Sequence, residues 1–98
     1  MLTKEQKYII DYLALHNGER YNLHKASEEL QELSLVLTQF LTKPQKVDKQ
    51  EIIDEIGDVI IRIAILKKMF PIEDIQKRIN DKLTKYKEYK DSKKYTHI

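Results

Sequence analysis

The sequence predicts an all-α protein with a single domain of four helices. Of its 98 residues only two are glycine and two are proline, so little in the chain opposes helix formation. Leucine, isoleucine, lysine and glutamate are abundant, and apolar residues recur at intervals of three and four, which places them on one face of a helix. A chain of this length has a modest core, and we expect residues 1–90 to form the domain.

The first helix is predicted at residues 4–16. Thr3 and Gln6 have the spacing of a capping box, in which each side chain accepts a hydrogen bond from the backbone N–H of the other. Asn17 and Gly18 follow the last helical residue, where helices commonly end. We expect the inner face of this helix to consist of Ile9, Tyr12 and Leu13.

The second helix is predicted at residues 22–42, with Asn22 as its N-terminal cap. Pro44 prevents the helix from continuing through the short segment that follows. The apolar residues of this stretch recur at helical spacing and predict a core face made of Leu23, Ala26, Leu30, Leu33, Leu37 and Phe40.

The third helix is predicted at residues 50–70 and is apolar nearly all the way round. Asp48 and Glu51 have the capping-box spacing at its start. Pro71 ends it and suits the first turn of a fourth helix. Residues 91–98 show no periodicity, and we expect them to form a disordered tail. The fourth helix carries a narrow apolar stripe of Ile72, Ile75, Ile79, Leu83 and Tyr86.

Two of the predicted helices each carry a pair of carboxylates three residues apart. Glu29 and Glu32 lie within or beside the apolar face of the second helix. Glu55 and Asp58 have the same spacing in the third helix and are flanked by apolar residues. A carboxylate in such surroundings needs a charged partner, because an unpaired buried charge is very costly. Antiparallel helices with these pairs at matching heights would surround one or two hard divalent cations.

Three blocks on successive predicted helices form an ordered set. They are E-x-x-E at Glu29 and Glu32, E-I-G-D at Glu55 to Asp58, and I-N-D-K-L-T-K-Y at residues 79–86. Together they resemble the MazG-type all-α nucleotide pyrophosphohydrolases. The resemblance implies magnesium-dependent hydrolysis of a nucleoside triphosphate at the α-phosphorus, which releases a monophosphate and pyrophosphate, with Mn²⁺ able to replace Mg²⁺.

The resemblance also implies roles for particular residues. The metal ligands and catalytic carboxylates would be Glu29, Glu32, Glu55 and Asp58. One of the second-helix glutamates could also act as the general base, and the sequence does not choose between them. The residues that would bind the substrate phosphates are Asn80, Lys82 and Lys85.

Surface salt bridges are the alternative explanation for the acidic residues. They account well for Glu28, Glu51 and Asp54, but poorly for carboxylates with apolar neighbours. Arg62 follows Asp58 by four residues, a spacing that favours an ion pair within the helix over a phosphate contact.

Charge divides unevenly along the chain. The first 75 residues hold ten basic and thirteen acidic side chains, and the last 23 hold eight and three. An acidic middle and a basic end suit a ligand made of a metal and a polyphosphate. The alternative is a non-catalytic interaction or nucleic-acid-binding module that uses the basic last helix, although no nucleic-acid-binding motif accompanies the lysines.

The isoleucines of the third helix cover more of its surface than three neighbouring helices can bury. Exposed apolar patches of that size mark interfaces, so we expect a homodimer or a dimer of dimers with this helix at its centre. The absence of cysteine agrees with a reducing compartment. Since the chain has neither a signal-peptide layout nor a membrane-length apolar run, we expect a cytoplasmic protein without membrane contact.

Overall fold

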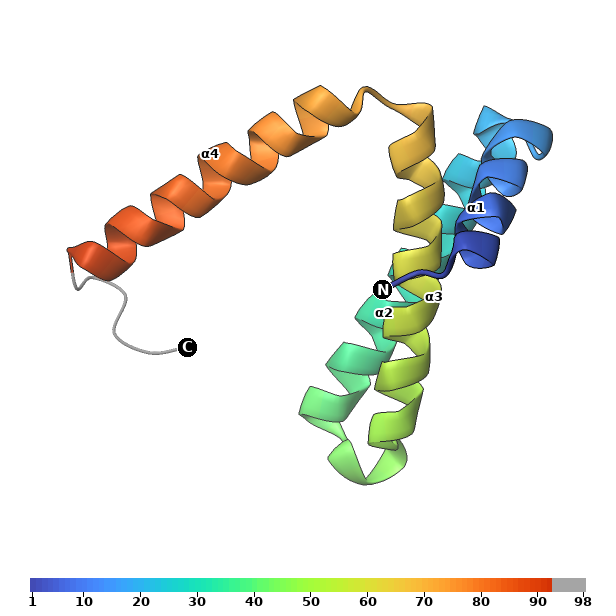
Figure 1. Cartoon of the computed structure of the whole chain (residues 1–98). Helices are drawn as coiled ribbons and strands as arrows, with labels where there is room; N and C mark the ends of the chain where they lie inside the picture. Colours follow the sequence, from blue (N-terminus) through green and yellow to red (C-terminus); the bar gives the residue numbers. More distant parts are fainter. Residues whose placement is uncertain (93–98) are drawn as a thin grey trace.

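The computed structural model describes residues 1–92, and these fold into helices without any strand, as the sequence predicts (Figure 1). Of the tail predicted at residues 91–98, Asp91 ends the last helix and residues 93–98 lie outside the described part. No helix within residues 1–92 is long and apolar enough to cross a membrane. The elements are α1 (Lys4–His16), α2 (Glu19–Thr42), the 3₁₀ turn η1 (Pro44–Lys46), α3 (Lys49–Met69) and α4 (Ile72–Asp91).

The start of α1 forms the predicted capping box. The Thr3 hydroxyl accepts from the Gln6 backbone N–H at 3.0 Å, and the Gln6 side-chain oxygen accepts from the Thr3 N–H at 2.8 Å. The predicted inner face is wrong in part, because Ile10 is buried whereas Ile9 and Tyr12 are about half exposed. A helix that packs mainly on one neighbour, here α3, has only a narrow stripe covered, and that stripe is centred on Ile10.

The start of α2 differs from the prediction. The helix begins at Glu19 after Gly18, whose φ of 84° suits a residue without a Cβ, so Asn22 is an interior residue rather than the cap. Asn22 is only 1% exposed, and its side-chain Nδ2 donates to the Leu13 carbonyl of α1 at 3.2 Å. The same carbonyl accepts from the Asn17 backbone N–H at 3.3 Å, so Asn22 supplies a second donor and ties α2 to the end of α1.

The ends of α3 lie one residue earlier than predicted, at Lys49 and Met69. Asp48 caps the helix as expected, but its side chain accepts from the Gln50 N–H at 3.0 Å rather than from that of Glu51. The cap therefore closes one residue sooner than a capping box would.

The two long helices α2 and α3 form an antiparallel hairpin (Figure 1). The residues that face each other are buried or half-buried and are spaced alternately three and four apart, as in a coiled coil. This inner seam consists of Asn22, Ala26, Glu29, Leu33, Val36 and Phe40 of α2 and Ile52, Glu55, Val59, Arg62, Leu66 and Met69 of α3. Fully buried Ile65 lies beside it.

A second apolar surface of the hairpin is not covered. Three of the six residues predicted for the core face of α2 are not buried, because Leu23, Leu30 and Leu37 are each more than 40% exposed. Each of these leucines comes directly after a seam residue in the sequence, and so do four exposed isoleucines of α3. In an antiparallel pair this offset turns both sets to the same side. We call the outer apolar face the set Leu23, Leu30, Leu37, Ile53, Ile56, Ile60 and Ile63.

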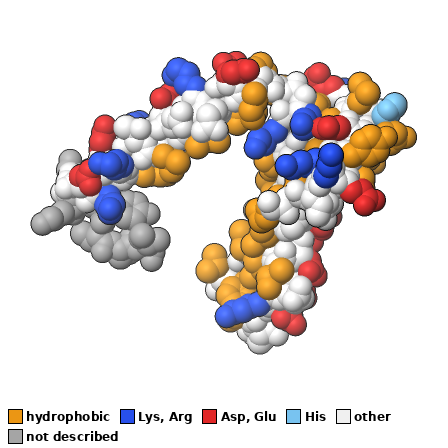
Figure 2. All heavy atoms as spheres, viewed as in Figure 1, with side chains coloured by type: hydrophobic (Ala, Val, Ile, Leu, Met, Phe, Trp, Pro, Cys, Tyr) orange, Lys and Arg blue, Asp and Glu red, His pale blue; other side chains and the backbone are white. Residues whose placement is uncertain are grey.

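The last helix, α4, departs from the hairpin and has no buried residue (Figure 1). Of its apolar stripe only Ile75 is half-buried, while Leu83 and Tyr86 are more than half exposed. Figure 2 shows apolar side chains along the side of α4 that faces the hairpin and along the hairpin itself. The Cα radius of gyration is 16.8 Å, against about 12.6 Å for a compact chain of this length.

Candidate functional site

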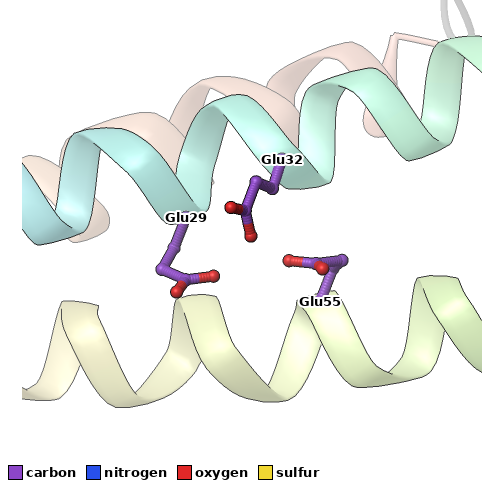
Figure 3. A group of neighbouring side chains, drawn as sticks. All are labelled: Glu29, Glu32 and Glu55. Atoms are coloured by element: carbon purple, nitrogen blue, oxygen red, sulfur yellow. The ribbon is translucent and has the colours of Figure 1, made fainter.

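Three of the predicted carboxylates meet between α2 and α3. Glu29 and Glu32 come from α2 and Glu55 comes from α3, and Figure 3 shows the three side chains turned toward one another in the space between the helices. One carboxylate oxygen from each lies within 4.8 Å of the others. The structure thus gathers the second-helix pair and half of the third-helix pair, as the spacing in the sequence led us to expect.

The turn of the hairpin explains why these residues meet. The chain reverses in the short segment between Thr42 and Lys49, so α2 and α3 run antiparallel and pack side by side. Glu55 of α3 thereby meets Glu29 and Glu32 of α2. The short connection and the helical spacing on both sides of it bring the three carboxylates together.

The acidic cluster is partly shielded from solvent. Glu29 and Glu55 are half-buried members of the seam, whereas Glu32 is exposed at its edge. The Oε2 atoms of Glu29 and Glu55 are enclosed and have no hydrogen-bond partner. An enclosed carboxylate oxygen without a donor or cation is costly, and a positively charged ligand bound here could satisfy both atoms.

Burial raises the pKa of both Glu29 and Glu55 above the ordinary value of 4.5. The negative charges of the neighbouring carboxylates raise each pKa further, with Glu32 the strongest contributor. For Glu29 the positive charge of Arg62 acts in the opposite direction. The site therefore disfavours its own ionised state in the absence of a cation.

The donor set fits a hard divalent cation. Mg²⁺ and Ca²⁺ take oxygen ligands at about 2.0–2.6 Å, so two ligands of one ion are at most about 4–5 Å apart. The three glutamate oxygens lie within 4.8 Å of one another, which is compatible with ligands of one ion. The enclosed oxygens of Glu29 and Glu55 are the atoms that would gain most from it.

The fourth predicted carboxylate, Asp58, lies at the margin of the cluster. It is exposed and is not one of the three residues whose oxygens meet, although its charge raises the pKa of both Glu29 and Glu55. In this arrangement Asp58 therefore acts on the acidic cluster through its negative charge.

The predicted phosphate-binding residues lie apart from the carboxylates. Asn80, Lys82 and Lys85 are all on α4, which leads away from the hairpin (Figure 1). The Asn80 side-chain oxygen accepts from Gln76 at 2.9 Å, and the Lys82 ammonium lies 5.8 Å from the centroid of the Tyr86 ring. Within one chain the carboxylates are brought together, and the third block is not brought beside them.

Arg62 is the cation that the structure does place near the cluster. Among residues 1–92 it forms no ion pair within 4 Å, so the expected pair with Asp58 is wrong. Asp58 faces solvent, whereas Arg62 belongs to the inner seam and has an enclosed guanidinium nitrogen without a hydrogen-bond partner. The three- and four-residue spacing that links Glu55, Val59 and Arg62 was the signal in the sequence that could have revealed this.

Comparison of the chain with models of protein families, with curated proteins and with solved structures gives no match.

Proposed function

We propose that the protein is a magnesium-dependent nucleotide pyrophosphohydrolase that uses the acidic cluster as its metal site. The observation that carries the proposal is that Glu29 and Glu55, which meet Glu32 between the two helices, each have an enclosed carboxylate oxygen without a hydrogen-bond partner. The resemblance of the three sequence blocks to the MazG-type family supports the reaction, which is hydrolysis of a nucleoside triphosphate at the α-phosphorus.

The carboxylates have two tasks in this proposal. Glu29, Glu32 and Glu55 hold the cation, with Asp58 as the fourth acidic group of the site. A bound Mg²⁺ or Mn²⁺ would offset phosphate charge and make water more acidic. A carboxylate that is not fully engaged then orients the attacking water and accepts its proton. Glu32 suits this task, because it is the exposed member at the open edge of the cluster.

The third block fits the proposal if the active protein contains more than one chain. In one chain α4 leads away from the cluster, but a homodimer or a dimer of dimers would bring Asn80, Lys82 and Lys85 of one copy toward the carboxylates of another. The apolar stripe of α4 and the outer apolar face of the hairpin are the surfaces that such an assembly would cover.

The exposed area supports the assembly. The chain has an accessible surface of 8392 Å², whereas a folded monomer of 11.7 kDa is expected to expose about 5,900 Å². Residues 93–98 can account for at most about 1,100 Å² of the difference, the surface of six fully extended residues. The remaining excess of about 1,400 Å² per chain would form an interface of about 2,800 Å² in total, which is within the range of obligate dimers.

The experiment is a survey of Mg²⁺-dependent pyrophosphate release from the common ribo- and deoxynucleoside triphosphates. Glu55→Gln should lower turnover at least about 100-fold and abolish the rise in melting temperature that Mg²⁺ causes in the wild type. Glu28→Gln is the matched control, because Glu28 is an exposed neighbour paired with Lys25 at 3.3 Å. If Glu28→Gln and Glu55→Gln have equal effects, or if Mg²⁺ leaves the wild type unchanged, the proposal is wrong.

A further inference from the structure

We propose that Arg62 is a phosphate-binding residue at the inner end of the acidic cluster, where it contacts a phosphoryl oxygen of a metal-bound polyphosphate. The inference rests on the proposed function, since it names a residue that recognises the substrate class of the same site. Arg62 belongs to α3, the helix that carries Glu55 and Asp58, so no partner copy is needed to bring it to the site.

The position of Arg62 in the hairpin is the first argument. Arg62 occupies an inner-seam position one helical turn after Asp58. Long side chains of a helix point back toward its N-terminus, which for Arg62 is the direction of Asp58 and Glu55.

Glu29 converges on the same place from the other helix. Glu29 is an inner-seam residue of α2, and Arg62 is close enough for its positive charge to act on the Glu29 carboxylate. Yet no ion pair within 4 Å joins them in the described part of the chain.

The second argument is that Arg62 and Glu29 each have an atom that lacks a hydrogen-bond partner. One guanidinium nitrogen of Arg62 is enclosed without an acceptor, and Oε2 of Glu29 is enclosed without a donor. Because the Arg62 guanidinium and the Glu29 carboxylate do not bond to each other, both can bind a ligand that contains a cation and an anionic oxygen. A divalent cation on the carboxylates and a phosphoryl oxygen on the guanidinium satisfy both atoms together. A guanidinium suits this role, since its planar fork can donate two hydrogen bonds to one phosphate group.

The alternative role of Arg62 is to neutralise the carboxylates. The two roles predict opposite behaviour when the charge is removed. If Arg62 only offsets negative charge, Arg62→Met should strengthen binding of Mg²⁺ and leave binding of magnesium pyrophosphate no weaker. If Arg62 holds a phosphate group, Arg62→Met should strengthen or preserve binding of Mg²⁺ alone but weaken binding of magnesium pyrophosphate.

The test measures two dissociation constants by titration calorimetry, for Mg²⁺ alone and for inorganic pyrophosphate at saturating Mg²⁺. We expect Arg62→Met to weaken pyrophosphate binding about 10–100-fold, the loss of one charge-assisted hydrogen-bonded contact. Arg62→Lys keeps the charge without the fork and should lie between Arg62→Met and the wild type. Lys68→Met is the matched control, because it removes a cation from the same helix that pairs with Asp11 at 3.1 Å outside the cluster.

Each outcome decides a separate question. If Arg62→Met binds Mg²⁺ and also binds pyrophosphate as tightly as the wild type, the phosphate role of Arg62 is wrong while the metal site stands. If the wild type binds no Mg²⁺, the proposed function and this inference both fail. If Arg62→Met does not fold, Arg62→Lys decides, and equal pyrophosphate affinity in Arg62→Lys, Lys68→Met and the wild type rejects the inference.

Discussion

The α2–α3 hairpin and α4 distribute charge and apolar surface in opposite ways. The hairpin encloses charged groups in its seam, where Glu29, Glu55 and Arg62 replace the apolar residues expected at coiled-coil positions. The apolar stripe of α4 has the same spacing but no buried member. The outer apolar face of the hairpin is likewise uncovered. The chain thus places charges where it folds on itself and leaves hydrophobic surface where it does not, which is why we propose a ligand for the former and a second copy for the latter.

The largest effect is expected from disrupting the outer apolar face. Ile60→Lys adds a charge to the middle of the face that we propose to be an interface, so association should weaken about 30-fold or more. Sedimentation equilibrium should then show the mass falling from a multiple of 11.7 kDa to 11.7 kDa at micromolar concentration. Gln31→Lys is the control, because Gln31 is an exposed residue that donates to Ser27. A wild type that is already monomeric would overturn the comparison.

The next effect tests the contrast between a covered seam and an uncovered stripe. In the monomeric Ile60→Lys background, Ile65→Ala should lower the free energy of unfolding by about 2–5 kcal/mol, since Ile65 is fully buried. Leu83→Ala should change it by less than about 0.5 kcal/mol, because Leu83 is 58% exposed on α4. Urea unfolding measures both. Equal losses in the monomer would show that α4 packs on its own hairpin in solution.

The smallest effect concerns the ionisation of the cluster in metal-free protein. The pKa of Glu55 is raised in the folded state, mainly by burial, so the folded protein binds a proton more readily than the unfolded chain. Stability from this group is present near the ordinary value of 4.5 and is lost as pH rises through the raised pKa. In EDTA, the melting temperature of the wild type should therefore rise by a few degrees relative to that of Glu55→Gln as pH is lowered from 7.5 toward 5.

Saturating Mg²⁺ should reverse that difference, because the cation requires ionised carboxylates and competes with protons. Glu28→Gln again serves as the control and should follow the wild type in both conditions, since Glu28 is exposed and lies outside the cluster. Parallel melting curves of Glu55→Gln and the wild type over this pH range would mean that the carboxylates do not share a low-polarity site.

Local signals explain what could be predicted from the sequence. The cap formed by Thr3 and Gln6 depends on residues three apart, and it is correct. The meeting of Glu29, Glu32 and Glu55 depends on a turn after Thr42 and on helical periodicity on both sides, and it is as predicted, whereas Asp58, the fourth predicted member, is not in the group whose oxygens meet. Such features do not depend on the distant parts of the chain.

The errors come from what packs against each helix. The residue type of Asn22 predicts an N-terminal helix cap, but its side chain instead donates to a carbonyl in the preceding helix. Leu30 and Leu33 are equally apolar, and only the position of α3 decides that Leu33 is covered and Leu30 is not. Arg62 has the spacing of a surface ion pair with Asp58, yet its place on the seam directs it inward. Periodicity identifies the apolar side of a helix but not its neighbour.

The turn between Thr42 and Lys49 also constrains how such a chain can change in length. Glu32 and Glu55 meet across the hairpin, so a one-residue insertion in either arm would shift one of them by about 1.5 Å and 100° relative to the other. Seven residues added to both arms would lengthen the hairpin by about 10 Å and leave the two glutamates facing each other. The interval between the two acidic motifs should therefore tolerate insertions and deletions only in matched pairs, in steps of about fourteen residues.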